Sequence, residues 1–153
     1  MGGTYKPGDQ VLLVDRKRRR YLVTLQPGAE FHSHTGVVAH DDIIGCENGT
    51  PIKSSRGSIF DTFRPTLAEF ILKMPRGAQV IYPKDLGPIL MLADVHPGVR
   101  VFESGVGSGA LSMALLRSGA QVTGYEIRED FAARARTNVA AMLGEDALED
   151  YQV

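Results

Sequence analysis

Residues 99–111 have the sequence V-R-V-F-E-S-G-V-G-S-G-A-L, in which a short apolar strand leads into a glycine-rich turn and the turn opens into a helix. Gly105, Gly107 and Gly109 carry no side chain, so the backbone can adopt positive φ there and can approach a ligand closely. The helix expected from about Ser108 would point its free N–H groups and the positive end of its dipole at the turn. This order of elements predicts a small-molecule site on the turn.

The residues after the turn continue the same pattern. A helix is expected over Ser108–Ser118, a strand over Gln121–Tyr125 and a second helix over Arg128–Leu143. A strand, helix, strand, helix sequence is typical of the start of a parallel, doubly wound α/β sheet. Such a sheet needs several strands and covered faces. Because only two parallel strands are expected before Val153, roughly half of an α/β domain is expected to be missing from the chain.

The residue composition and the frequency of turn signals change near Arg64-Pro65. Before this point, runs rich in Val, Ile, Leu and Thr alternate with Pro-Gly, Asn-Gly and Arg-Gly turn signals, as in small antiparallel β domains. We therefore expect a small β domain over residues 1–63 and the first part of an α/β domain over residues 64–153. The strands expected in the β domain are Gln10–Asp15, Tyr21–Leu25, Val37–Ala39, Ile52–Ser54 and Ser58–Phe63.

Two helices are expected between the β domain and the glycine turn. Pro65 suits the first position of a helix, and apolar residues at helical spacing continue to Met74, before Pro75 ends the pattern. A second helical stretch is expected over Lys84–Ala93, interrupted at Gly87-Pro88.

Composition sets the broad class of the protein. The chain has 153 residues, of which 43% are hydrophobic, and this is enough for a buried core. The net charge of −1 gives no global reason for a polyanionic partner. Cys46 is the single cysteine, so no intramolecular disulfide can form. No apolar run approaches the roughly 18 residues of a membrane span, and the N-terminus lacks a secretory segment. A cytoplasmic location is expected.

Three interpretations of the glycine turn compete. Gly105, Gly107 and Ala110 fit the dinucleotide pattern G-x-G-x-x-A, and Glu126 lies about 20 residues further on, as a nicotinamide site requires. Glu103, two residues before the first glycine, instead favours S-adenosylmethionine: this acid would engage the amino-acid end, Glu126 would bind the ribose hydroxyls, and no pyrophosphate needs a place. The third interpretation is a tight turn without a ligand.

Several motifs in the same order resemble the N-terminal half of the tRNA (adenine-58-N1)-methyltransferases, in their bacterial and archaeal form. The resemblance covers essentially the whole chain. It implies a small N-terminal β domain, the start of a Rossmann-like class I methyltransferase domain, S-adenosylmethionine as methyl donor, and a homotetramer that grips tRNA. The motifs are P-G-A-E-F-H-S-H-T-G (27–36), H-D-D-I-I-G (40–45), I-K-S-S-R-G (52–57), F-R-P-T (63–66), M-P-R-G-A-Q-V-I-Y-P-K-D (74–85), V-F-E-S-G-V-G-S-G-A-L (101–111) and Y-E-I-R-E-D-F-A (125–132).

The resemblance also implies a set of donor-binding residues. Gln79 and Tyr82 would help to close the pocket, Glu126 would bind the ribose, and Arg128 would flank the adenine. Ser104 stands where the family usually has alanine, a change that the turn is expected to tolerate. The turn residues expected to hold the methionine portion are Glu103, Ser104, Gly105, Val106, Gly107, Ser108, Gly109 and Leu111.

No catalytic residue is expected in the sequence. The aspartate motif that lies near the target adenine in the family has no counterpart before Val153. We therefore expect the chain to keep part of the donor site and to be inactive by itself. A non-catalytic tRNA-binding or assembly subunit is the first alternative, and a nicotinamide dinucleotide-binding protein is the second.

Histidines and acids gather in the β domain. His32, His34 and His40 with Asp41 and Asp42 have the side chains of a metal site, but the His-x-His pair lies in an expected loop without a cysteine in range. Hydrogen bonds to the loop backbone, or a place near a subunit contact or RNA, are the preferred interpretation. No metal site is expected.

The run Arg16-Lys17-Arg18-Arg19-Arg20 is the densest basic cluster of the chain. In a turn between strands such a run is most often solvated. The resemblance adds the hypothesis that it contacts tRNA phosphates, in which case binding would depend on salt.

Overall fold

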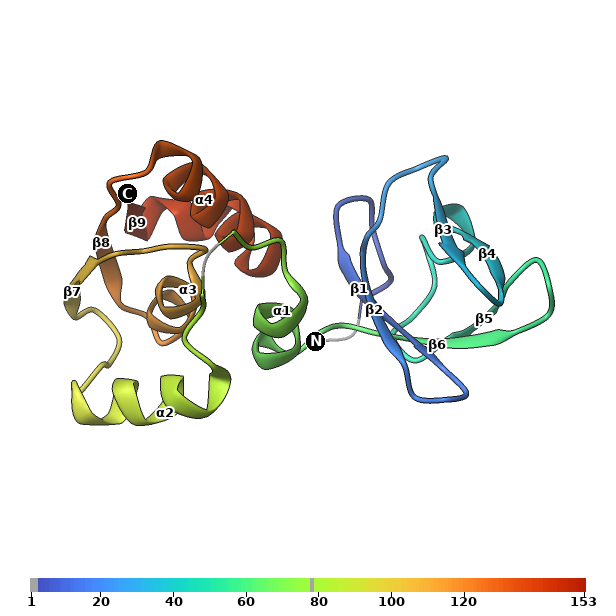
Figure 1. Ribbon diagram of the computed structural model, residues 1–153, viewed down its shortest axis with the longest axis horizontal. Helices are drawn as coiled ribbons and strands as arrows, with labels where there is room; N and C mark the ends of the chain where they lie inside the picture. The colour runs from blue at the N-terminus through green and yellow to red at the C-terminus, as the bar shows by residue number, and fades with distance from the viewer. Residues whose placement is uncertain (1–2, 78) are drawn as a thin grey trace. The chain divides into compact units, whose positions relative to one another are not determined.

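The computed structural model describes residues 3–77 and 79–153, which form two units divided between Thr66 and Leu67 (Figure 1). The division falls close to the boundary that the sequence places after residue 63. Ala78, inside the quoted motif at 74–85, lies outside the described residues.

The N-terminal unit consists of antiparallel strands. Four of them form a sheet in the order β2-β1-β6-β5, and the other two form a hairpin, β3-β4. In the sheet, Leu12 of the central strand lies opposite Leu22 on one side and Phe63 on the other. The elements are β1 (Gln10–Asp15), β2 (Arg20–Thr24), β3 (Glu30–Ser33), β4 (Gly36–Ala39), the short 3-10 helix η1 (His40–Asp42), β5 (Pro51–Lys53) and β6 (Ile59–Phe63).

The core of this unit lies between the sheet and the β3-β4 hairpin. The rings of Tyr21, Phe31 and Phe60 meet there, with centroids 5.2 to 6.3 Å apart in tilted and edge-to-face arrangements. The buried core side chains are Tyr5, Val11, Leu13, Val23, Leu25, Val38, Ile43, Ile52 and Phe60. The expected β domain is therefore confirmed, with its own hydrophobic core.

Strand β3 is a correction to the sequence analysis. His32 lies in this strand and pairs with Val37, whereas a loop was expected for the His-x-His pair. Within E-F-H-S, only Phe31 is a large apolar residue, so the period-two pattern is too weak to identify from sequence. Phe31 turns to the core, and this contact is what makes the segment a strand.

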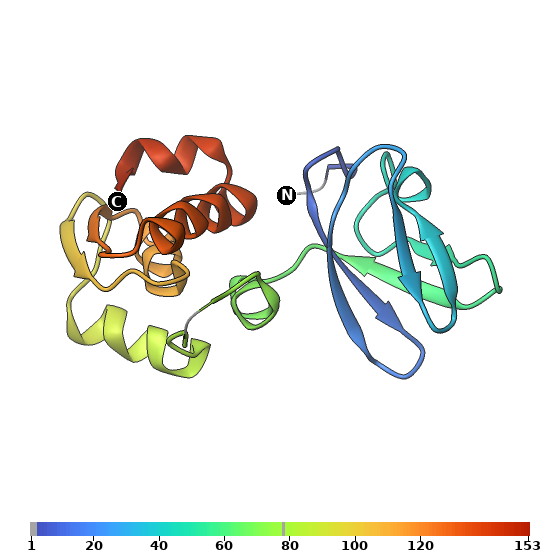
Figure 2. The ribbon, with the colours of Figure 1, turned by 45° about the horizontal axis from the view of Figure 1, so that its top comes forward.

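The C-terminal unit contains three parallel strands in the order β7-β8-β9. Helices α3 and α4 lie on the same side of this sheet, as both views show (Figures 1 and 2). On the strands, Phe102 and Tyr125 are 68% and 60% exposed and stack with their centroids 5.0 Å apart. The elements are α1 (Leu67–Lys73), α2 (Pro83–Leu92), β7 (Arg100–Ser104), α3 (Ala110–Arg117), β8 (Gln121–Tyr125), α4 (Glu129–Leu143), the 3-10 helix η2 (Glu145–Asp150) and β9 (Tyr151–Gln152).

Helix α2 is continuous, although an interruption was expected at Gly87-Pro88. Pro88 lies inside the helix. A residue before proline is normally pushed out of the helical region by a clash between its Cβ and the proline ring. Gly87 has no Cβ, so this part of the clash is absent. Pro83, at the start of the helix, suits a position where the N–H has no partner.

Two further boundaries differ from the sequence analysis. Helix α3 begins at Ala110 rather than near Ser108, because Gly109 adopts a left-handed conformation with φ of 84° and forms the cap. The sheet has a third strand, β9, where only two parallel strands were expected. Its two residues pair with Val122 and Thr123, and so short a strand leaves no periodicity to detect.

In the described part of the chain, no helix is both long enough and apolar enough to cross a membrane.

Candidate functional site

The glycine turn lies between the end of β7 and the start of α3. Gly105, Gly107 and Gly109 have φ of 80°, 58° and 84°, so the expected left-handed conformations are confirmed. A Cβ at Gly105 or Gly107 would meet no atom within 4 Å, whereas one at Gly109 would lie 3.2 Å from Cα and Cβ of Ala135 in α4. The first two glycines therefore leave open space at the turn, and the third allows close packing of α4.

Glu126 holds the turn to the end of β8. Its Oε2 accepts a hydrogen bond from the Gly107 N–H at 2.9 Å, and its Oε1 accepts one from the Arg128 N–H at 3.1 Å. The hydrogen bond from Gly107, followed by that from Arg128, lowers the pKa of the Glu126 carboxyl below its ordinary value. The side chain is thus a charged carboxylate, which has further acceptor positions beyond these two bonds.

Glu103 lies under the turn rather than in the open. It is 6% exposed, and its Oε2 accepts a hydrogen bond of 2.6 Å from the Ser112 hydroxyl. Tyr151 in turn donates to the Ser112 Oγ at 3.1 Å. Burial raises the pKa of Glu103, and burial raises that of Tyr151 to about 12. The sequence analysis found the acid but neither of the residues that contact it.

Asn138 of α4 connects the turn to the segment after α1. Its Nδ2 donates to the carbonyl oxygens of Ser108 and Pro75, both at 3.0 Å. The hydroxyl of Ser108 is buried, and it is the one buried side-chain polar atom in the described residues without a hydrogen-bond partner. The sequence analysis missed Asn138. One signal was available, since it is an amide beside Ala135 and Val139 on the buried side of an otherwise apolar helix stripe.

An open cavity of about 380 Å³ adjoins the turn. It is lined by Ser104 and Gly105 from β7 and the turn, and by Tyr125, Glu126 and Ile127 from the end of β8. Ile127 is 97% exposed. The cavity therefore combines an aromatic and an aliphatic side chain with one carboxylate, at the carboxyl ends of two parallel strands, where ligands bind in open α/β sheets.

Some residues of the expected site lie apart from this cavity. Gln79 and Tyr82 are exposed, and within the described residues no hydrogen bond joins either of them to the turn. Glu103 and the half-buried Leu111 line a separate cavity of about 450 Å³ beside β7 and α2, and Ser104 borders both cavities. The Arg128 guanidinium binds Asp130 at 2.9 Å and stacks on Phe131 with 4.1 Å to the ring centroid.

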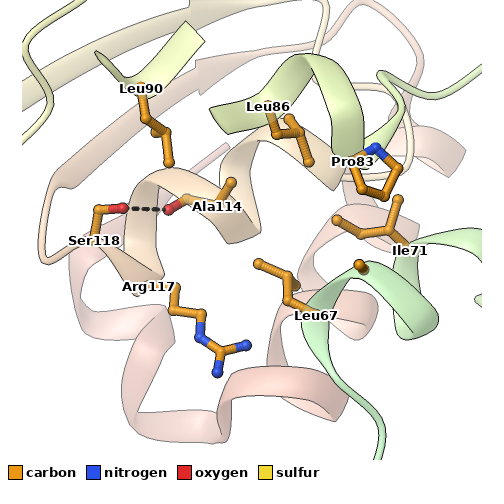
Figure 3. Close-up of a pocket in the computed structure, with 9 residues that line it drawn as sticks. Leu67, Ile71, Pro83, Leu86, Leu90, Ala114, Arg117 and Ser118 are labelled. Atoms are coloured by element: carbon orange, nitrogen blue, oxygen red, sulfur yellow. Dashed lines mark hydrogen bonds between the residues drawn. The ribbon is translucent and has the colours of Figure 1, made fainter. Parts of the chain in front are cut away.

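A further cavity of about 210 Å³ lies at the opposite end of α3 from the turn. Figure 3 shows Leu67, Ile71, Leu86 and Leu90 around it, with Ala114 and Ser118 on α3. Its lining is largely aliphatic. Its polar lining residues are Arg117 and Ser118, and its lining includes no carboxylate for a nucleoside diol or an ammonium group, so we do not include it in the candidate site.

The histidines and acids of the β unit have local partners. His40 Nδ1 accepts a hydrogen bond from the Gln26 N–H at 3.1 Å, and the Asp41 carboxylate accepts one from Gly28. His32 lies 3.2 Å from Glu30. Hydrogen bonds to loop backbone were expected, and they are confirmed for His40 and Asp41. Residues 3–77 and 79–153 contain no group of three His, Cys, Asp or Glu arranged to hold a metal ion.

The basic run occupies the turn between β1 and β2. Arg19 is bound to Asp15 by an ion pair of 2.6 Å. Arg16, Lys17 and Arg18 are exposed, and none of their side chains has a partner within the described residues. Arg20 also has an interaction partner, so the run presents three free cations rather than five.

Two family models match the chain. The model described as TrmI-like N-terminal matches residues 3–52. The model described as tRNA methyltransferase complex GCD14 subunit matches residues 60–143, more than half of the chain.

Curated and solved proteins agree with these matches. The chain is 40% identical over 134 residues to the tRNA (adenine(58)-N(1))-methyltransferase TrmI of Thermus thermophilus, covering 86% of this chain and 52% of that protein. A crystal structure described as a SAM-dependent O-methyltransferase from Thermotoga maritima has a TM-score of 0.88 and 34% identity, covering 97% of this chain and 56% of that one. The tRNA (m1A58) methyltransferase TrmI of Aquifex aeolicus has a TM-score of 0.76 and 33% identity, covering 91% and 54%. The chain thus spans about half the length of the relatives it matches.

Proposed function

The chain belongs to the tRNA (adenine-58-N1)-methyltransferase family, and we propose that its glycine turn, Glu103 and Glu126 form the S-adenosylmethionine half of such an enzyme's active site. The observation that carries the proposal is the open cavity at the turn, with the Glu126 carboxylate held beside Gly107. The reaction would transfer a methyl group to N1 of an adenine in the T-loop of tRNA.

The residues around the turn fit the proposed donor. Open space at Gly105 and Gly107 leaves the backbone free to approach a ligand, and the Ser108 hydroxyl provides a polar atom without a partner among the described residues. Glu126 has acceptor positions left for the two hydroxyls of a ribose. Tyr125 and Ile127 offer apolar surface for a purine ring. A pyrophosphate would need the backbone N–H groups of the glycine turn, and the Gly107 N–H already donates to the Glu126 carboxylate, which weighs against the nicotinamide alternative.

When bound, S-adenosylmethionine supplies an activated methyl group on its sulfonium. The contribution of this chain is then binding and orientation: Glu126 fixes the sugar, and the turn fixes the amino-acid end. Positioning of the two reactants supplies much of the rate enhancement in such a transfer. The aspartate implied to hold the target base has no counterpart within residues 1–153. These residues by themselves are therefore proposed to bind the donor without turnover.

The proposals on substrate and assembly come from the family and from the sequence motifs that resemble it. We propose a tRNA substrate, assembly as a homotetramer, and a cytoplasmic location. N1 of adenine is a base-pairing atom, so methylation requires the target base to leave its stack. No resident metal is proposed, because the methyl group is already activated by its sulfonium.

Calorimetry with S-adenosylhomocysteine tests the donor proposal. We expect saturable binding of one ligand per chain and a rise in melting temperature, because a ligand that binds only the folded state stabilises it. NADH serves as the control ligand. Stabilisation by NADH but not by S-adenosylhomocysteine would contradict the proposal and favour the nicotinamide alternative.

A labelled-donor assay with unmodified tRNA tests the tRNA proposal. Transfer of label to adenine N1 would support an enzyme. Retention of tRNA without transfer would support the non-catalytic subunit. Absence of both binding and transfer, in a protein that spans the full length of its relatives, would contradict the tRNA proposal.

The basic run predicts a salt-dependent part of tRNA binding. Replacing Arg16, Lys17 and Arg18 with glutamine should weaken tRNA binding and lower the slope of log affinity against log salt by about one per lost phosphate contact. Replacing Arg19, which is bound to Asp15, should change the slope less. A filter-binding series at several salt concentrations measures both. An unchanged slope in the triple variant would show that the basic run is solvated and does not contact tRNA phosphates.

A further inference from the structure

A chain of three buried polar side chains ends on the acid of the donor site. Tyr151 of β9 donates to Ser112 of α3, and Ser112 donates to Glu103 of β7. We propose that Ser112 and Tyr151 are positioning residues, which orient the Glu103 carboxylate toward the ammonium group of the methyl donor. This inference rests on the proposed donor site, and it assigns roles to two residues that the sequence analysis did not identify.

The direction of the hydrogen bonds is fixed by the proton count. Ser112 has one hydroxyl proton, and the 2.6 Å bond to Glu103 uses it. The Tyr151 hydroxyl must then be the donor to Ser112, and its raised pKa of about 12 keeps its proton in place. Both residues are buried, at 0% and 1% exposure, so solvent does not compete for these bonds. These two hydrogen bonds therefore hold Oε2 of Glu103 in one orientation.

The second oxygen of Glu103 remains available. Oε1 has no hydrogen bond to the described residues, yet it is not among their fully buried unpartnered atoms. It therefore keeps some access from outside, and Glu103 borders the cavity of about 450 Å³ beside β7 and α2. Oε1 has the unfilled acceptor capacity that an incoming N–H donor would need.

The charge balance around Glu103 is incomplete. Within the described residues, no lysine or arginine pairs with this carboxylate, and the Ser112 hydroxyl is its one hydrogen-bond donor. Burial of a carboxylate with one neutral donor is unfavourable, and a hydrophobic residue could fill the same space without that cost. A cationic ligand would supply the missing counter-charge. This is the physical reason to assign the network to ligand binding rather than to packing.

The network also predicts how donor binding depends on pH. The ammonium needs an ionised Glu103, and burial raises the pKa of this carboxyl. Affinity for S-adenosylhomocysteine should therefore begin to fall at a higher pH than for an ordinary glutamate as the solution is acidified. Removal of the Ser112 hydroxyl raises the pKa further and moves this onset to still higher pH. The other titratable groups nearby are Tyr151 and, at its backbone oxygen, Arg136 of α4. The raised pKa of Tyr151, about 12, keeps its hydroxyl neutral in that range.

A comparison of two ligands tests the inference. S-adenosylhomocysteine carries the ammonium, whereas 5′-methylthioadenosine has the same nucleoside without the amino-acid part. In the full chain, Ser112→Ala and Tyr151→Phe should weaken binding of the first ligand by about three- to tenfold, the effect of one hydrogen bond. Binding of the second should not change. Glu103→Gln, which keeps the shape and removes the charge, should give the larger loss with the same selectivity.

Other outcomes would contradict either the positioning roles of Ser112 and Tyr151 or the donor site itself. If a variant weakens both ligands equally, or neither, the two residues are structural and the inference is wrong. If Ser112→Ala does not fold, Tyr151→Phe, which removes a single hydroxyl, decides the question through its ligand selectivity and its pH onset. If the unaltered chain binds neither ligand, the proposed donor site itself is wrong, and this result is distinct from unselective variants of a chain that binds.

Discussion

Replacement of Gly107 with alanine is expected to reduce affinity for S-adenosylhomocysteine by at least about tenfold. An L-residue in the left-handed region costs roughly 1–2 kcal/mol, and at Gly107 φ is 58°. The added methyl group would also enter the open space of the turn, where, apart from the two neighbouring residues, no described residue has an atom within 4 Å of the new Cβ. The methyl group would therefore occupy space proposed for the ligand. Isothermal titration calorimetry measures the change in affinity.

Gly98 offers a matched control for this experiment. It also has a positive φ, 82°, and a Cβ there would likewise meet no atom within 4 Å, but it lies before β7 and away from the turn. Gly98→Ala should lower the melting temperature by a similar amount and leave donor affinity unchanged. If both variants lost affinity to the same extent, the loss would reflect general destabilisation, and the open space at Gly107 would have no role in binding.

Replacement of Glu126 with alanine is expected to give a comparable loss of donor affinity. The change removes the proposed contact to the ribose and also leaves the Gly107 and Arg128 N–H groups without their acceptor. Hydrogen bonds to charged groups are stronger than neutral ones, so we expect a loss on the order of tenfold or more. Because the nucleoside is affected, binding of 5′-methylthioadenosine should weaken together with that of S-adenosylhomocysteine.

Glu129 is the matched control for Glu126. It is an exposed acid in the first turn of α4, and it has no hydrogen bond or ion pair to the described residues. Glu129→Ala removes the same charge three residues away and should leave affinity within about twofold of the unaltered chain. Equal losses in the two variants would show that net charge near the site, rather than the contacts of Glu126, controls binding.

The two acids should respond to pH in a fixed order. The Gly107 and Arg128 amides lower the pKa of Glu126, so its hydrogen bonds persist above its unfolded pKa and are lost only as pH falls through the lowered folded value. Glu103 has a raised pKa and is protonated first. On acidification, affinity for S-adenosylhomocysteine should therefore fall before affinity for 5′-methylthioadenosine. Calorimetric titrations of both ligands over a pH series measure the order, and the reverse order would contradict the two assignments.

The sequence predicted those parts of the protein in which neighbouring residues carry their own signal. Glycine spacing and apolar strands placed the turn between β7 and α3, and strand β8 was predicted with its observed bounds, Gln121–Tyr125. Segments without a periodic pattern of their own were not predicted. Strand β3 has one large apolar residue, and β9 has two residues in all, so neither contains a periodic pattern. Both become strands through partners that are distant along the chain.

The amino-acid sequence by itself determined the two-part α/β organisation, the glycine turn and the two acids beside it, because strand periodicity and positive-φ glycines are properties of consecutive residues. Only the tertiary structure decided what each acid contacts. Glu126 accepts a hydrogen bond from the Gly107 N–H, 19 positions away. Ser112 connects Glu103 to Tyr151, which lies 39 positions after Ser112. Such contacts depend on which strands become neighbours in the sheet. The spacing of residues along the chain does not determine which strands these are. The same packing buries Glu103 and leaves Glu126 near solvent, so the two glutamates beside the glycine turn have pKa values shifted in opposite directions.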